Sequence, residues 1–145
     1  SDAYVEILSG NLNGTLTRRF VKASLIAEQA ADIDAAANYA LSAAWAADDA
    51  SNVTSANSCR YRTASLLKEL LKENDHSSEE AISIRTRMVD ILRRSEQWEK
   101  AISLAETTLS QNVDPTIKSV LEFGISAASR HDAKCYTIDQ ALGEK

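Results

Sequence analysis

Two residues with the chemistry of a nucleophile and its base lie close together near the end of the chain. His131 and Cys135 are four positions apart, so in a helix they would share one face. An imidazole beside a thiol can favour the thiolate or supply half of a metal site. We see no third or fourth ligand in the pattern, so a surface histidine beside a core or boundary cysteine is favoured over a metal site.

Adjacent carboxylates occur twice, at Asp48-Asp49 and at Glu79-Glu80. General acid–base catalysis needs two carboxyl groups in differently tuned surroundings. Both pairs fall at predicted helix ends, where acids complement the helix dipole or stay solvated. The sequence also has no Gly-rich phosphate loop and no G-x-S-x-G motif. We therefore expect no catalytic residue, no bound metal and no cofactor, and we predict that the protein is not an enzyme.

Basic side chains are concentrated in three stretches. The guanidinium group of arginine binds carboxylates or phosphates through two parallel hydrogen bonds with fixed geometry. Two interpretations remain open: a surface that holds an acidic partner, or a solvated face with intramolecular pairs such as Asp90–Arg94. The three stretches carry Arg18, Arg19 and Lys22; Arg60, Arg62, Lys68 and Lys72; and Arg85, Arg87, Arg93 and Arg94.

The two tryptophans are also candidates for a binding surface, because tryptophan anchors many interfaces. Trp45 lies one helical turn after Leu41, and Trp98 precedes Ala101 and Ile102 at helical spacing. This spacing favours packing in the core, and we predict that both indole rings are structural.

Composition limits the class of protein. The chain has 145 residues, of which 44% are hydrophobic and 26% are charged, with four Gly and one Pro. These values predict a globular domain of long helices joined by short turns. The net charge of −5 argues against a protein that wraps nucleic acid, whose affinity comes from a basic excess. No apolar run approaches the length of a membrane span.

The cysteines and the amino terminus bear on the compartment. Cys59 and Cys135 are far apart and neither belongs to a C-x-x-C pair, which favours a reducing compartment, and we predict a cytoplasmic protein. The chain does not begin with Met. This leaves open a processed or engineered end, a removed signal peptide, or a missing neighbouring domain.

Apolar residues recur at helical spacing along most of the chain, and nothing indicates a strand. We predict Thr17 as one N-cap, Asp34 as another, and Asp114 as a third with Pro115 in the first turn behind it. Residues 1–16 are weakly patterned and are expected to be poorly ordered or to form one short helix. The predicted helices cover about 17–31, 34–48, 51–73, 81–92, 97–111, 114–128 and 132–142. The predicted fold is all-α, an irregular array of antiparallel helical hairpins.

One stretch resembles a known repeat family. After a short turn, Trp98, Ala101, Ala105 and Pro115 occupy positions typical of the second helix of a tetratricopeptide repeat. A fainter copy has Ile33, Ala36, Ala40 and Ala43, and another begins around Asp132, Ala133 and Tyr136. The helix before Trp98 departs from the family pattern, with Arg85, Met88, Val89 and Leu92 near its signature positions. The chain therefore resembles a degenerate tetratricopeptide array.

The resemblance implies a fold and a function. It implies one α-α superhelical domain over residues 17–143 that binds a peptide or helix of another protein in a concave groove. Some members hold the acidic end of a peptide with Lys, Arg and Asn, so Asn57, Arg60 and Arg85, together with Tyr61, are the candidate partner-binding residues. An accessory or regulatory domain of a larger enzyme or transcription regulator is the alternative. Nucleic-acid binding through the arginine clusters is a third and less favoured hypothesis.

Overall fold

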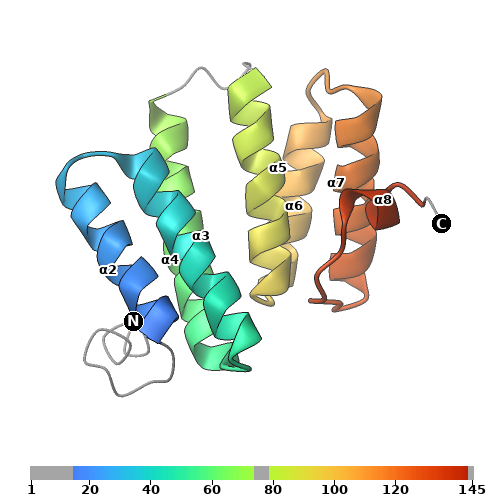
Figure 1. Cartoon of the computed structure of the whole chain (residues 1–145). Coiled ribbons are helices and arrows are strands. Elements are labelled where there is room, and N and C mark those ends of the chain that lie inside the picture. Colours follow the sequence, from blue (N-terminus) through green and yellow to red (C-terminus); the bar gives the residue numbers. More distant parts are fainter. Residues whose placement is uncertain (1–14, 74–78, 144–145) are drawn as a thin grey trace. The chain divides into compact units, whose positions relative to one another are not determined.

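The computed structural model describes residues 15–73 and 79–143, and within these ranges it contains seven helices and no strand (Figure 1). The prediction of an all-α fold is therefore confirmed. Residues 1–14 of the weakly patterned amino-terminal segment lie outside the described residues. The helices are α2 (Thr15–Gln29), α3 (Ile33–Asp49), α4 (Val53–Lys72), α5 (Glu79–Arg94), α6 (Trp98–Leu109), α7 (Pro115–Ser129) and α8 (Ile138–Ala141).

The chain divides into two compact units, with the boundary between Lys72 and Glu73. The first unit contains α2, α3 and α4, and the second contains α5 to α8. Each is described by itself below. The predictions of a single domain over residues 17–143 and of a superhelix remain predictions. No helix of the described part combines the length and apolar character that a membrane crossing requires.

In the first unit, α3 packs against both α2 and α4. The buried side of α3 consists of small side chains, which allow two neighbouring helices to approach its backbone closely. Val21 of α2 and Cys59 of α4 meet this surface, and the hydroxyl of Ser24 donates a 2.8 Å hydrogen bond to the carbonyl of Ala36. The alanines on this side are Ala36, Ala37, Ala40, Ala43, Ala44 and Ala47, each at most 1% exposed.

In the second unit, α5, α6 and α7 each contact the other two helices. Val89, Ala105 and Leu121 form the centre of the core, one residue from each helix. Gly124 of α7 lies directly against α5, since a Cβ atom placed there would be only 3.1 Å from Cγ1 of Val89. The missing side chain thus sets the close spacing of these two helices.

Four helices of the two units end with the same backbone turn. Ala31, Ser51, Glu96 and His131 have φ between 55° and 63°, the left-handed conformation of a Schellman C-cap. After each of them, the next residue donates its backbone N–H to the carbonyl five positions earlier. These next residues are Asp32, Asn52, Gln97 and Asp132. After the first three, a helix begins at once, which produces antiparallel hairpins with a minimal connection.

The structure corrects two predicted caps and confirms a third. Asp32, not Asp34, caps α3, because its carboxylate accepts from the backbone N–H of Ala35. Thr17 is not an N-cap; it lies inside α2 and is buried. Asp114 does cap α7 with Pro115 behind it, as predicted. Sequence propensity locates a helix end only to within a few residues. The start of α3 is set by the Schellman turn before it, which propensity does not reveal.

Candidate interaction surface

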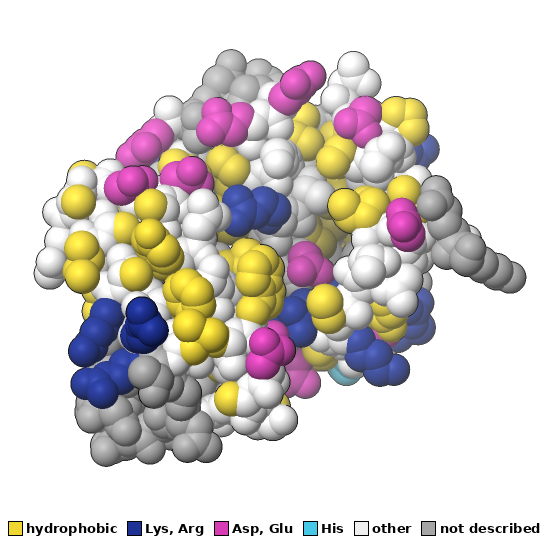
Figure 2. Space-filling model, in the orientation of Figure 1, with side chains coloured by type: hydrophobic (Ala, Val, Ile, Leu, Met, Phe, Trp, Pro, Cys, Tyr) yellow, Lys and Arg dark blue, Asp and Glu magenta, His cyan; other side chains and the backbone are white. Residues whose placement is uncertain are grey.

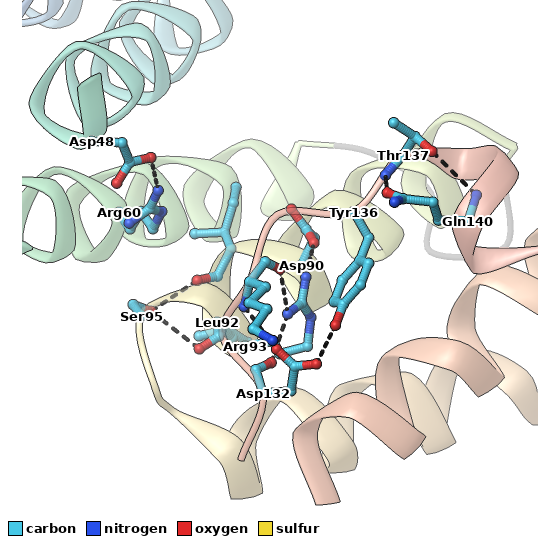
Figure 3. Close-up of polar contacts among 12 residues, drawn as sticks. Asp48, Arg60, Asp90, Leu92, Arg93, Ser95, Asp132, Tyr136, Thr137 and Gln140 are labelled. Atoms are coloured by element: carbon cyan, nitrogen blue, oxygen red, sulfur yellow. Dashed lines mark hydrogen bonds and ion pairs between the residues drawn. The ribbon is translucent and has the colours of Figure 1, made fainter. Parts of the chain in front are cut away.

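Arg60, one of the four predicted partner-binding residues, is turned toward its own unit. Its side chain is only 4% exposed and forms an ion pair with Asp48 near the end of α3 (Figure 3). A second guanidinium nitrogen lies 3.5 Å from Oδ1 of Asn57, one turn earlier on α4. Arg60 therefore joins α4 to α3. A similar ion pair joins Arg62 of α4 to Glu28 of α2.

Asn57 and Tyr61 lie on the side of α4 that faces away from the buried residues Cys59, Thr63 and Leu66. Together with Lys68 and Lys72 they fall within about 60° on the helix, at 100° per residue. The Tyr61 side chain is 47% exposed, both lysines are exposed, and Asn57 is half-buried. Cys59, Thr63 and Leu66 face the other way and are buried. We call Asn57, Tyr61, Lys68 and Lys72 the α4 stripe; it combines an aromatic ring, an amide and two cations.

Arg85, the fourth predicted residue, lies on α5 in the second unit and is 8% exposed. It thus belongs to a different unit from Asn57, Arg60 and Tyr61. The structure brings Asn57 and Tyr61 onto one face and places Arg60 in an internal ion pair. That the four residues act together on a partner remains a prediction.

Trp45 is a correction to the sequence analysis, because its side chain is 52% exposed instead of packed in the core. It lies on the side of α3 opposite the buried alanines. The alanine side of α3 is occupied by α2 and α4, which pack closely against it, and an indole ring there would push them away. Figure 2 shows hydrophobic side chains along the visible surface of α2 and α3, and Lys and Arg side chains over the first half of α2, which carries Arg18, Arg19 and Lys22.

A cluster of contacts around Arg93 in the second unit was not expected from the sequence (Figure 3). Arg93 is 2% exposed, although arginine is rarely buried without partners. One of its terminal nitrogens donates to the backbone carbonyls of Asp132 and Lys134, at 2.7 and 2.8 Å. The other pairs with the carboxylate of Asp90 at 2.8 Å. The ion pair therefore joins Asp90 to Arg93, one position before the Arg94 that the spacing suggested.

Tyr136 completes this cluster from the chain segment that follows α7. Its ring centre lies 5.6 Å from the guanidinium carbon of Arg93 and 5.0 Å from the ring centre of Phe123, edge to face. Its hydroxyl donates to the carboxylate of Asp132. This hydrogen bond is the largest cause of the lowered pKa of Asp132, and a hydrogen bond from the backbone N–H of Lys134 is the second largest. The same bond to Asp132 raises the pKa of Tyr136.

The expectation that His131 and Cys135 share one helical face is wrong, and so is that of a core or boundary cysteine, whereas His131 does lie at the surface. Residues 132–137 are not helical, and the predicted helix over 132–142 is reduced to α8. His131 stacks on Trp98 instead, and Cys135 is exposed. A surface hollow of about 470 Å³ is lined here by Arg130, His131, Asp132, Ala133 and Lys134. Among the described residues, no three His, Cys, Asp or Glu side chains are grouped to hold a metal ion.

The other cysteine is chemically quiet. Cys59 is buried between α2, α3 and α4, and burial raises the pKa of its thiol to about 12, with the cation of Arg60 opposing the shift. Since the thiolate is the reactive form, Cys59 acts as a small core residue.

No protein-family model, no curated protein and no solved structure matches this chain.

Proposed function

We propose that this protein is a non-catalytic interaction module with a tetratricopeptide-like architecture, which binds an acidic peptide or helix of a partner protein. Three of the four Schellman turns support the architecture. Gln97 follows Asp32 by 65 positions and precedes Asp132 by 35, close to two periods and one period of a 34-residue repeat. Ala36 and Ala101 are buried at equivalent places, four residues after the turn. We also propose a cytoplasmic location, on the basis of the two free thiols.

The contact pattern of the second unit supports the same architecture. In a stack of helical hairpins, each repeat packs against its neighbour, so the first helix of one hairpin touches both helices of the hairpin before it. α7 has this relationship to α5 and α6.

The α4 stripe is the observation that carries the binding proposal. Tyr61 is 47% exposed, and tyrosine, which combines an apolar ring with a polar hydroxyl, is enriched at interfaces. Lys68 and Lys72 lie on the same face, about two and three helical turns after Tyr61. Their positive charge, on an otherwise acidic protein, attracts acidic partners. A helix or extended peptide with an apolar anchor followed by acidic residues fits this order of groups.

A peptide-display selection against the full chain tests this function. We expect the selected peptides to be rich in Asp and Glu and to carry one aromatic or aliphatic anchor. The affinity of a selected peptide should fall at least tenfold in Tyr61→Ala and in a Lys68→Glu/Lys72→Glu variant. Binding should also weaken as the salt concentration rises, because exposed charges are screened.

Lys118→Glu is the matched control, since Lys118 is an exposed lysine on α7 in the other unit. It makes the same change in net charge as one stripe substitution, and it should leave the affinity within twofold of the wild type. Equal losses of affinity in the control and stripe variants would mean that the change in net charge alone explains the weaker binding. A selection that yields no acidic peptide would contradict the proposal.

A further inference from the structure

The turn after α7 starts like the other three Schellman turns but does not lead into a helix. In the first three, the carbonyl of the residue after the turn accepts the first helical hydrogen bond from an alanine four positions on. These bonds join Ala36 to Asp32, Ala56 to Asn52 and Ala101 to Gln97, each at 3.0 Å. All three alanines are at most 1% exposed, so each faces the neighbouring helix.

At the fourth turn, the equivalent position is Tyr136, four residues after Asp132. A helix starting there would direct a tyrosine ring at the place where the other hairpins have a methyl group, and overpacking of this size is destabilising. The carbonyl of Asp132 accepts instead from Arg93, and so does that of Lys134. In a helix both of these carbonyls would accept backbone N–H groups.

We propose that Arg93 and Tyr136 together hold residues 132–137 as an extended strap in place of the second helix of a hairpin. Arg93 occupies the carbonyls that a helix would need. Tyr136 packs its ring on Phe123 and over the guanidinium group. Both holding contacts are required, so the strap is a conformational switch element: its residues have a second, helical arrangement that becomes available when the contacts of either Arg93 or Tyr136 are lost.

Backbone chemical shifts in the full chain give a direct test. In the wild type, the Cα shifts of residues 133–137 should be non-helical. Tyr136→Ala places an alanine at the position where the other three turns have one, and it leaves the buried Arg93 unchanged. In this variant the shifts should move to helical values. Tyr136→Phe keeps the ring and loses only the bond to Asp132, so its shifts should stay non-helical.

A second variant examines Arg93 itself. Arg93→Met should free the strap, seen as at least tenfold faster cleavage after Lys134 by a lysine-specific protease, with the helix content of the other elements kept. Cleavage at the wild-type rate in a folded Arg93→Met protein would overturn the role of Arg93. If this variant does not fold, Tyr136→Ala decides: unchanged non-helical shifts there, or an equal change in Tyr136→Phe, would overturn the proposal.

Discussion

The indole ring of Trp98 lies parallel to the imidazole ring of His131, with ring centres 5.0 Å apart and planes 3° apart. Trp98 is the first residue of α6, and His131 is the left-handed residue after α7. The stack therefore joins two turns of the second unit that are more than 30 residues apart in sequence. It gives the turn after α7 a fixed place even though no helix follows directly.

We expect the rings of this stack to be coupled by about 0.5–1.5 kcal/mol, the range for aromatic pairs beyond their buried area. A double-mutant cycle with Trp98→Leu and His131→Ala measures the coupling. Urea unfolding should be followed by far-ultraviolet circular dichroism, because Trp98→Leu removes one of the two tryptophans. Strictly additive losses in the double variant would show that the two rings are neighbours without mutual stabilisation.

The internal ion pair of Arg60 should matter more for stability than the neighbouring pair of Arg62. Asp48→Asn leaves a nearly buried guanidinium without its carboxylate, and we expect a loss of about 1–3 kcal/mol. Glu28→Gln is the matched control, because both side chains of the Glu28–Arg62 pair are partly exposed; it should cost about 0–1 kcal/mol.

Thermal and urea unfolding of the two variants provide the comparison. The emission of Trp45 in a Trp98→Phe background reports the first unit, which contains both pairs. Equal stability of Asp48→Asn and the wild type would mean that burial of Arg60 does not depend on Asp48.

The raised pKa of Cys59 predicts a loss of stability at alkaline pH. Below about pH 9, the ordinary pKa of a free thiol, the thiol is protonated in both the folded and the unfolded state. Above it, the unfolded chain loses a proton that the folded chain keeps until about pH 12. The free energy of unfolding should then fall by as much as about 1.4 kcal/mol per pH unit from this group.

Cys59→Ala removes this contribution while it leaves the other alkaline groups unchanged. The difference in free energy of unfolding between wild type and variant should therefore shrink as the pH rises from 8.5 to 10.5. A constant difference over this interval would contradict the assignment. A thiol reagent should also modify one cysteine, Cys135, in the folded protein and both after unfolding.

Gly124 should tolerate one carbon atom but not a large side chain. Gly124→Ala gains about 1 kcal/mol of helix propensity, which is offset because the new methyl group would press on Val89. We expect a stability within about 1 kcal/mol of the wild type. Gly124→Leu should lose about 1–3 kcal/mol or more through overpacking. Chemical denaturation of both variants decides this, and a stable Gly124→Leu protein would show that α5 and α7 separate easily.

The helices themselves were predictable because spacing and caps are local signals. Asp114 and Pro115 mark the start of α7 in the sequence as clearly as in the structure, and the alanine positions of α3 predict its buried side. The position of Trp45 was not predictable in the same way. Its spacing from Leu41 fits a core face, and only the closeness of α2 and α4 to the alanines shows that the ring must point outward.

The strap was missed because its cause is a contact across about 40 residues. Residues 132–142 have a helical pattern, and that local preference is overridden by Arg93, whose hydrogen bonds to two carbonyls no spacing rule reveals. A signal did exist: tyrosine at position 136 stands where Ala36 and Ala101 stand in the related turns. Among the candidate binding residues, the spacing of Asn57 and Tyr61 was enough to place them on one face. The burial of Arg60 required knowledge of where Asp48 lies.

Mapping where a selected acidic peptide binds on the full chain tests the interaction module most directly. Amide chemical shifts recorded with increasing peptide should change around Asn57, Tyr61, Lys68 and Lys72, and little around the α7 residue Lys118. This is the result that the α4 stripe predicts. Changes confined to α5, α6 and α7 or to residues 130–134, with the shifts of α4 unaltered at saturation, would contradict it.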